Sequence, residues 1–253
     1  MINLSPAKKL NLISEKISFD TPTSPRFLKK TDSLIKKLIN LSLVELRKTM
    51  KISDSLTRLN YERYKNFSKN DEKNIKPAIF MFAGDTFNGL SVRSMDIRSF
   101  EYAQKNLRIL SGLYGILRPF DKIKPYRLEM GTNLSSLIGS DLYKFWKNDI
   151  CNSLTEDIKE SGSKYLFNLS SNEYFKSVEA SKLEVEIVNF DFKKNINNEL
   201  KGIGMMIKRL RGSMAKFIIE NKVKNLDVLK DFNYLGFSFK ELNKKDNCFL
   251  FIN

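Results

Sequence analysis

Four charged residues next to predicted loops have side chains that can do acid–base chemistry: Lys8, Asp85, Glu129 and Glu173. Two carboxylates in one cleft can act as general acid and general base when their surroundings move their pKa values apart. The same carboxylates can instead pair with arginine or lysine and serve only the fold. The sequence therefore makes these four residues catalytic candidates and leaves the ion-pairing alternative open.

The stretch from Leu107 to Gly131 gathers residue types that are scarce in the chain, with three of 11 glycines and two of six prolines. At its centre, Gly112 and Gly115 enclose Tyr114 and predict a tight turn, because glycine accepts positive φ without strain. A glycine-rich turn can present backbone N–H groups to a DNA phosphate, a contact that carries no base identity. The alternative is a structural turn that joins two buried elements.

Basic side chains with the geometry to hold phosphate occur in two places. They are Arg118 and Arg127 beyond the glycine turn, and Lys208, Arg209 and Arg211 at the predicted start of a helix. Arginine offers two parallel donors to a phosphate, which lysine cannot do. Together with the turn residues they form the predicted DNA-binding set, and a solvated basic surface is the alternative.

The charge balance points to a polyanionic partner. The chain of 253 residues has 44 basic and 29 acidic side chains, a net charge of +15 and a pI near 9.6. A surplus of this size favours nucleic acid first and an acidic membrane second. Lysine outnumbers arginine by 33 to 11, so codon bias alone can account for part of the surplus of basic residues.

The absence of histidine narrows the possible chemistry. It excludes Ser-His-Asp and Cys-His catalysis as well as histidine-based zinc and di-iron sites. Cys151 and Cys248 lie far apart and form no metal-ligand pattern, and their apolar surroundings argue against a peroxide-sensing role. We therefore expect no metal and no cofactor. No apolar run reaches membrane-spanning length and no secretory signal is seen, so a cytoplasmic location is expected.

The apolar patterning predicts one compact α+β domain over residues 1–253, with a mixed sheet and surrounding helices. Strands are predicted at 1–5, 78–83, 164–169, 183–192 and 203–207, with a terminal hairpin formed by 236–242 and 248–252. Helices are predicted at 25–41, 42–50, from 53 onward, and at 96–106, 140–159 and 211–221. Residues 107–110 fit either the last turn of a helix or a strand, and residues 71–76 form a polar linker.

Five blocks of the chain resemble, in order, the peroxide stress protein YaaA family. The blocks are LSPAK at 4–8, FAGDTFNGL at 82–90, LSGLYGILRPFDKIKPYRLEMGT at 110–132, NLSSNEYFK at 168–176 and KRLRGSMAKFII at 208–219. The resemblance implies an α+β domain of unusual topology that binds DNA through a helix-hairpin-helix element. It also implies a role in limiting iron-driven damage under peroxide. Tyr114 makes the turn one residue longer than the usual glycine–apolar–glycine spacing.

We therefore expect a DNA-binding protein of low sequence specificity that acts in the response to peroxide and limits iron-driven damage indirectly. Its partner would be double-stranded or structured DNA and not a membrane, and a monomer is favoured. An enzyme acting on a small anionic or nucleotide-like substrate through the loop carboxylates is the alternative, although a non-enzymatic role is favoured. RNA binding is a third possibility, but no aromatic RNP-type strand is present.

Overall fold

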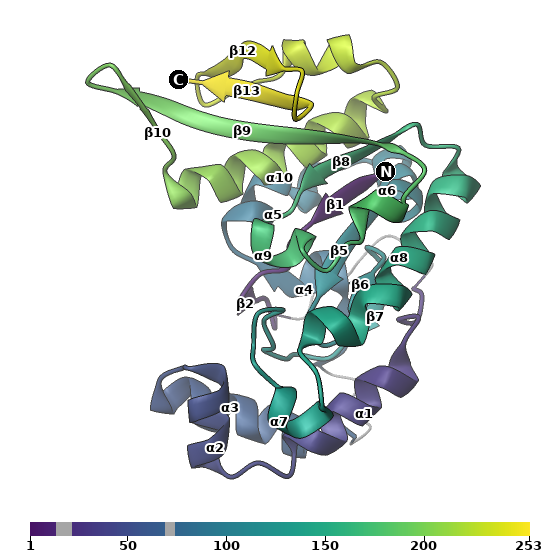
Figure 1. The fold of residues 1–253 in the computed structure, drawn as a ribbon, viewed down its shortest axis with the longest axis vertical. Coiled ribbons are helices and arrows are strands. Elements are labelled where there is room, and N and C mark those ends of the chain that lie inside the picture. The colour runs from purple at the N-terminus through teal and green to yellow at the C-terminus, as the bar shows by residue number, and fades with distance from the viewer. Residues whose placement is uncertain (14–21, 69–73) are drawn as a thin grey trace.

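A mixed β-sheet runs through the centre of the computed structural model, which describes residues 1–13, 22–68 and 74–253 (Figure 1). The strands of this sheet are β1 (Ile2–Leu4), β5 (Leu107–Ser111), β6 (Gly115–Leu117), β8 (Tyr165–Leu169), β9 (Glu186–Ile196), β10 (Glu199–Lys201), β11 (Asn233–Tyr234), β12 (Phe237–Asn243) and β13 (Cys248–Ile252). Their order is β11-β12-β13-β9-β8-β1-β5-β6, and β10 pairs with β9. Two small antiparallel pairs join β2 (Lys9–Leu10) to β4 (Phe82–Ala83), and β3 (Lys76–Pro77) to β7 (Lys122–Ile123).

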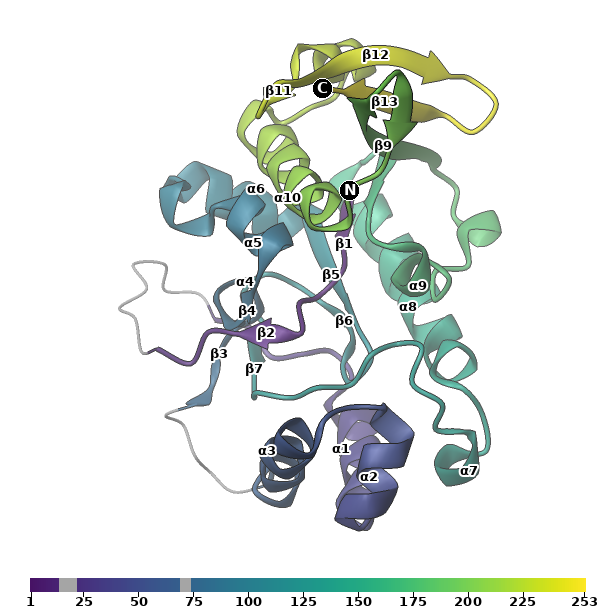
Figure 2. The ribbon, with the colours of Figure 1, turned by 90° about the vertical axis from the view of Figure 1, so that its left-hand side faces the viewer.

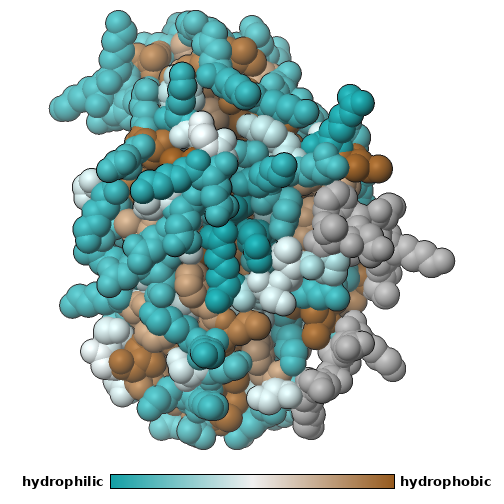
Figure 3. Space-filling view, turned by 90° about the vertical axis from the view of Figure 1, so that its right-hand side faces the viewer, coloured by the Kyte–Doolittle hydropathy of each residue, from teal (hydrophilic) through white to brown (hydrophobic). Residues whose placement is uncertain are grey.

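Helices cover both faces of the sheet, which gives the α+β architecture expected from the sequence. The helices are α1 (Leu28–Leu38), α2 (Leu43–Met50), α3 (Asp54–Lys65), α4 (Ala78–Met81), α5 (Asp85–Leu90), α6 (Ile97–Asn106), α7 (Ser135–Ile138), α8 (Leu142–Ser161), α9 (Asn172–Phe175) and α10 (Gly204–Asn221). In the part of the chain that the structure describes, no helix is long and apolar enough to cross a bilayer. Figure 3 shows a mostly hydrophilic surface on one side of the molecule.

Strand β1 lies in the middle of the sheet, and its three residues, Ile2, Asn3 and Leu4, are all buried. It pairs in parallel with β5 on one side and with β8 on the other, so that Asn3 lies between Arg108 and Asn168. The carboxyl ends of β1, β5 and β8 therefore lie at the same edge. The chain reaches the strands on either side of β1 by separate crossovers, and ligands of open α/β sheets commonly bind at such a switch point.

Two glycines set the close packing of α10 against α5, which lies beside the sheet (Figure 2). A Cβ at Gly212 would overlap the carbonyl oxygen of Thr86, and a Cβ at Gly89 would overlap the carbonyl oxygen of Arg209. Only glycine therefore permits main chain to lie against main chain at this crossing. The contact brings the middle of α10, at Gly212, against Thr86 at the start of α5, next to Asp85.

A buried charged cluster, which we call the Asp157 cluster, ties α8 to β5. Asp157 of α8 accepts two hydrogen bonds from Arg108 of β5, at 2.6 and 2.7 Å, and two from Arg26, at 2.9 and 2.6 Å. Bidentate arginine–carboxylate pairs combine charge with fixed geometry. Because Asp157 and Arg108 are both buried, these bonds satisfy polar groups that water does not reach.

The glycine turn predicted as a helix-hairpin-helix element is a β-hairpin in the structure. Strands β5 and β6 flank it and pair in antiparallel register, which settles residues 107–110 as strand. Trp146 donates a hydrogen bond to the Gly112 carbonyl at 2.9 Å, and the Tyr114 N–H donates to Ser111 Oγ at 2.9 Å. A Cβ at Gly115, where φ is +74°, would lie 2.7 Å from the Trp146 ring. The turn is thus buried in the core.

Several elements agree with the sequence because local signals define them. Ser42 accepts a hydrogen bond from the Glu45 N–H, and Glu45 accepts one from the Ser42 N–H, which is the predicted capping box of α2. Asp96 caps α6 through the Ser99 N–H at 2.7 Å. The strand at 1–5, the helices at 25–41 and 140–159, the strands at 164–169 and 183–192, and the terminal hairpin are confirmed within a few residues.

Two predicted strands are wrong. Residues 78–83 form the helical turn α4 followed by the two-residue strand β4, since a continuous apolar run does not distinguish a buried helix from a buried strand. Residues 203–207 belong almost entirely to α10, which begins at Gly204, well before the predicted start. Lys208, Arg209 and Arg211 therefore lie inside the helix. Of the predicted linker, residues 71–73 lie outside the described residues.

Candidate functional site

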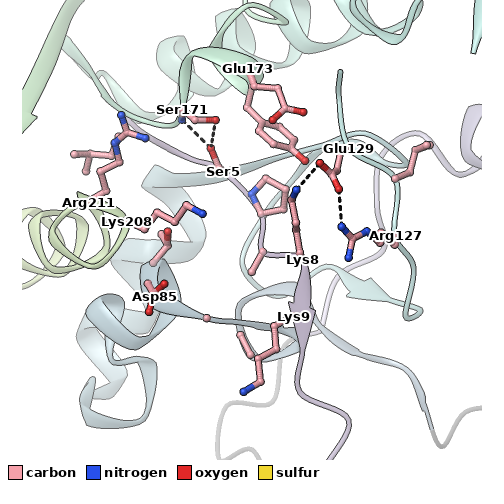
Figure 4. A pocket seen from close by; sticks show the side chains of 18 of the residues that line it. Ser5, Lys8, Lys9, Asp85, Arg127, Glu129, Ser171, Glu173, Lys208 and Arg211 are labelled. Atoms are coloured by element: carbon pink, nitrogen blue, oxygen red, sulfur yellow. Dashed lines mark hydrogen bonds and ion pairs between the residues drawn. The ribbon is translucent and has the colours of Figure 1, made fainter. Parts of the chain in front are cut away.

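A pocket of about 260 Å³ opens at the carboxyl ends of β1 and β8 (Figure 4). Its walls come from segments that are far apart in sequence: the loop after β1, the start of α5, the loop after β7, the segment around α9, and α10. The charged residues among the pocket lining are Lys8, Lys9, Asp85, Arg127, Glu129, Glu173, Lys208 and Arg211. All four catalytic candidates from the sequence therefore lie in one pocket.

A carboxylate held between two cations, which we call the Glu129 cluster, forms one wall. Glu129 Oε2 lies 2.7 Å from Lys8 Nζ, and its Oε1 accepts a hydrogen bond from Arg127 at 2.9 Å. The main chain at Arg127 is itself fixed, because its carbonyl accepts a hydrogen bond from the buried Tyr64 hydroxyl. Glu129 is therefore held in place and carries no uncompensated negative charge into the pocket.

Glu173, on α9, adds a second carboxylate to the pocket. Its Oε1 accepts a hydrogen bond from the Gly131 N–H at 3.0 Å. Burial, together with the negative charges of Glu173 and Asp141, raises the pKa of the nearby Tyr143 hydroxyl. Since Oε1 can accept more than one hydrogen bond and Oε2 is uncommitted in this contact, the carboxylate retains acceptor capacity for a ligand.

Two serines that sequence reasoning missed join the strand ends beneath the pocket. Ser5 Oγ accepts a hydrogen bond from the Ser171 N–H at 2.8 Å and donates one to Ser171 Oγ at 3.2 Å. Ser5 follows β1 and Ser171 follows β8, so the bonds tie together the ends of two neighbouring parallel strands. Both residues fall within blocks that resemble the family, which was the available signal, but serine is too common to stand out by type.

The opposite wall carries two cations, Lys208 and Arg211, and the carboxylate of Asp85 (Figure 4). Lys208 and Arg211 are three residues apart on α10, and neighbours at this spacing share a helix face. Figure 4 shows both on one side of the pocket, with Lys8, Arg127 and Glu129 on the other. Within the described ranges, neither Lys208 nor Arg211 forms an ion pair with a carboxylate. Burial lowers the pKa of Arg211, and the charge of Asp191 only partly opposes this.

Other members of the predicted DNA-binding set lie outside this pocket. Arg118 contacts the buried Asp121 at 2.9 Å and 3.1 Å, so its charge is compensated within the fold. Arg209 is exposed and donates a hydrogen bond to the Tyr234 hydroxyl at 3.1 Å. The structure thus brings Arg127, Lys208 and Arg211 together and leaves Arg118 and Arg209 elsewhere.

The predicted phosphate contact at the glycine turn does not fit the structure. Gly112, Tyr114 and Gly115 are all buried. An N–H group that contacts DNA must reach the surface, and the Tyr114 N–H is already bonded to Ser111. Sequence reasoning recognised a backbone-shaping motif here but could not tell that Trp146 and the core cover it.

Possible metal ligands and both thiols can be located among the described residues. Across 1–13, 22–68 and 74–253, no group of three or more histidine, cysteine, aspartate or glutamate side chains is placed to hold a metal ion. Cys151 is buried, and Cys248 is half-buried with a pKa that burial raises above its usual value. A raised thiol pKa disfavours the reactive thiolate.

The fold and the pocket define a basic α+β protein with a charged cavity at the ends of parallel strands. The model of the peroxide stress protein YaaA family matches residues 1–243, and the chain belongs to that family. It is 43% identical over 251 residues to a UPF0246 protein of Legionella pneumophila strain Corby, covering 98% of this chain and 97% of that protein. It is 42% identical over 258 residues to a UPF0246 protein of Aliivibrio fischeri strain MJ11, covering 99% and 97%.

Proposed function

We propose that this protein binds DNA with little sequence preference and acts in the response to peroxide, where it limits iron-driven damage indirectly. The observation that carries the proposal is the uneven distribution of charge along the chain. Residues 22–68 hold 11 basic and 4 acidic side chains, and residues 193–245 hold 13 and 5. Residues 74–192 hold 15 of each. Basic side chains concentrated in two parts of the chain support a binding surface for a polyanion more strongly than net charge alone.

The two basic regions lie toward opposite ends of the long axis of the molecule (Figure 1). Helices α1 to α3 form the first, and α10, the β9–β10 ribbon and the β12–β13 hairpin belong to the second. DNA carries phosphates at regular intervals along its length, so separated basic surfaces can engage one duplex at several points. Contacts of this kind would hold the backbone without reading bases.

Two short helices on a tight turn occur within the first basic region. Helices α2 and α3 are joined by residues 51–53, and Lys51 adopts a left-handed conformation with φ of 51°. Lys48, Lys51 and Arg58 are exposed there, and none forms an ion pair with a carboxylate in the described part of the chain. This pair replaces the buried glycine turn as our candidate for the helix-hairpin-helix contact.

A salt titration of DNA affinity tests the proposal. If about six phosphates are neutralised, the slope of log affinity against log salt is about −5 for duplex DNA. The triple variant K48Q/K51Q/R58Q should reduce the slope by about one unit for each phosphate that is no longer neutralised. Absent or salt-insensitive binding to both duplex and junction DNA would remove the proposal.

The matched control removes the same charge from the neutral region. The variant K105Q/K144Q/K164Q changes three exposed lysines there and should leave the slope close to that of the wild type. Equal losses of affinity in the two triple variants would mean that net charge, and not the α2–α3 surface, governs binding. In cells, deletion of the gene should increase killing by peroxide, and the K48Q/K51Q/R58Q variant should complement poorly.

An enzyme acting on a small anionic or nucleotide-like substrate is the second candidate. The specific observation in its favour is that Lys8, Asp85, Glu129 and Glu173 all line one pocket. A concave site with convergent polar groups is the usual form of a small-ligand site. Screening for turnover of phosphorylated metabolites, with Glu129→Gln as the inactive control, tests this candidate.

A further inference from the structure

We infer that the pocket binds one phosphorylated sugar unit, as found in a nucleotide, with its phosphate on Lys208 and Arg211 and its hydroxyl groups on Glu129 and Glu173. The inference rests on the second candidate function and supplies the ligand class that this function leaves open. It is independent of DNA binding at the α2–α3 surface.

The phosphate end is assigned from the two cations of α10. Lys208 and Arg211 face the pocket from one helix, and neither has a carboxylate partner in the ion pairs of the described residues. Arg211 is half-buried, and burial lowers its pKa. Withdrawing a cation from water without an ion-pair partner is costly. An anion bound at this wall would offset that cost. Phosphate oxygens can accept hydrogen bonds from the two parallel N–H donors of an arginine and from a lysine amine.

The hydroxyl end is assigned from the two carboxylates. Glu129 is neutralised by Lys8 and Arg127, so it can accept hydrogen bonds from a sugar without repelling the phosphate of the same ligand. Glu173 is held by the Gly131 N–H and keeps free acceptor positions. Ionised carboxylates only accept hydrogen bonds, so they select ligand groups that donate, such as hydroxyls.

The pocket volume limits the ligand to a single unit. At about 260 Å³ it lies just below the range of about 300–1,000 Å³ that is usual for drug-sized ligands. A sugar phosphate, or the sugar phosphate of one nucleotide, fits this scale, whereas a duplex does not enter. The unit can come from a free nucleotide or from a nucleotide displaced out of a DNA strand.

Calorimetric titration with ribose 5-phosphate, inorganic phosphate and ribose tests the assignment. Ribose 5-phosphate should bind more tightly than either fragment. Arg211→Met and Lys208→Gln should each weaken it at least about tenfold, the size of a lost charged hydrogen bond. Glu173→Gln should weaken ribose 5-phosphate by several-fold and leave inorganic phosphate unchanged, because phosphate alone has no sugar hydroxyl to donate to that side chain.

Lys216→Gln is the control on the same helix, since the Lys216 amine donates to Ser94 Oγ at 2.6 Å and lies outside the pocket lining. It should bind ribose 5-phosphate as the wild type does. No binding of ribose 5-phosphate, or binding that survives both Lys208→Gln and Arg211→Met, would overturn the inference. Lys208 is exposed, so its variant remains informative even if Arg211→Met folds poorly.

A competition experiment distinguishes the two sources of the sugar phosphate, a free nucleotide and a nucleotide displaced out of DNA. Deoxyadenosine 5′-monophosphate is titrated into the free protein and into its complex with a DNA hairpin that contains one unpaired nucleotide. Competition that Lys208→Gln removes supports a displaced nucleotide, and unchanged nucleotide affinity supports a free one. Binding without turnover would contradict the enzyme candidate alone. Loss of DNA binding in K48Q/K51Q/R58Q with ribose 5-phosphate binding retained would separate the two surfaces.

Discussion

The Asp157 cluster and the Glu129 cluster are built alike, since in each a carboxylate is held by two cations. They differ in access to water: the side chains of Asp157 and Arg108 are 1% and 4% exposed, whereas those of Glu129 and Lys8 are 25% and 62% exposed. The first lies between α8 and β5, and its carboxylate already accepts four hydrogen bonds from Arg26 and Arg108. The second faces a pocket. Similar residues and distances therefore serve the fold in one place and are available to a ligand in the other.

The largest expected effect comes from removing the buried carboxylate. Asp157→Asn leaves Arg26 and Arg108 without a charged partner, and breaking a buried pair in this way costs about 3–5 kcal/mol. Urea unfolding measures the loss in the free energy of unfolding. The control is Asp149→Asn, which removes the partly exposed partner of Lys30 and should cost about 1 kcal/mol or less. Equal losses in the two variants would contradict the contrast between the clusters.

Gly212→Ala should have the next largest effect. The added methyl group meets the Thr86 carbonyl, so α10 must shift away from α5, and overpacking of this kind costs about 1–3 kcal/mol. Because Lys208 and Arg211 move with the helix, binding of ribose 5-phosphate should weaken as well. Gly204→Ala, where an added Cβ meets no atom within 4 Å, is the control and should not destabilise the protein. Calorimetry of unfolding and of binding tests both variants.

A smaller effect on the free energy of unfolding is expected when the pH is lowered. Burial raises the pKa of Asp157, but the hydrogen bonds and charges of Arg108 and Arg26 outweigh it, and the net pKa lies below the usual value. The unfolded chain therefore takes up the proton first. The stabilisation is complete above about pH 4, the usual aspartate value, and is lost as the pH falls through the folded pKa. Asp157→Asn should show a shallower loss of stability below pH 4 than the wild type, and parallel curves would contradict this.

The smallest effect on stability is expected at the Glu129 cluster. Glu129→Gln removes an ion pair whose lysine is largely exposed, and such pairs contribute about 0–1 kcal/mol. Affinity for ribose 5-phosphate should nevertheless fall several-fold, because the sugar hydroxyls lose a charged acceptor. A loss of stability as large as that of Asp157→Asn would show that the two clusters play the same structural role.

The sequence defines those parts of the fold whose causes are local. The Ser42–Glu45 capping box and the Asp96 cap lie within three residues of their partners, so the starts of α2 and α6 could be predicted. Residues 78–83 and 203–207 could not, since an apolar run has no period and its structure depends on what packs against it. The packing of α10 on α5 joins residues 120 or more positions apart.

The grouping of the carboxylates with Lys8 could be predicted from the sequence, but the choice of arginines that join them could not. The blocks that resemble the family contain Lys8, Asp85, Glu129 and Glu173, and the structure places all four in one pocket. The arginines were grouped by residue type, although Arg118 already has a partner in Asp121. Pairing and burial depend on distant parts of the chain, so composition identifies candidate cations without showing which of them remain available.

The backbone contact between α5 and α10 fixes how this pocket can change. Where two helices meet through side chains, they can slide as those side chains vary, but here carbonyl groups rest against glycines and leave no such adjustment. We therefore expect the ligand selectivity of the pocket to change through substitution of side chains on α5 and α10, and not through movement of the two helices. Replacement of Lys208 or Arg211 can therefore change the chemistry of the cavity while the backbones of α5 and α10 keep their places.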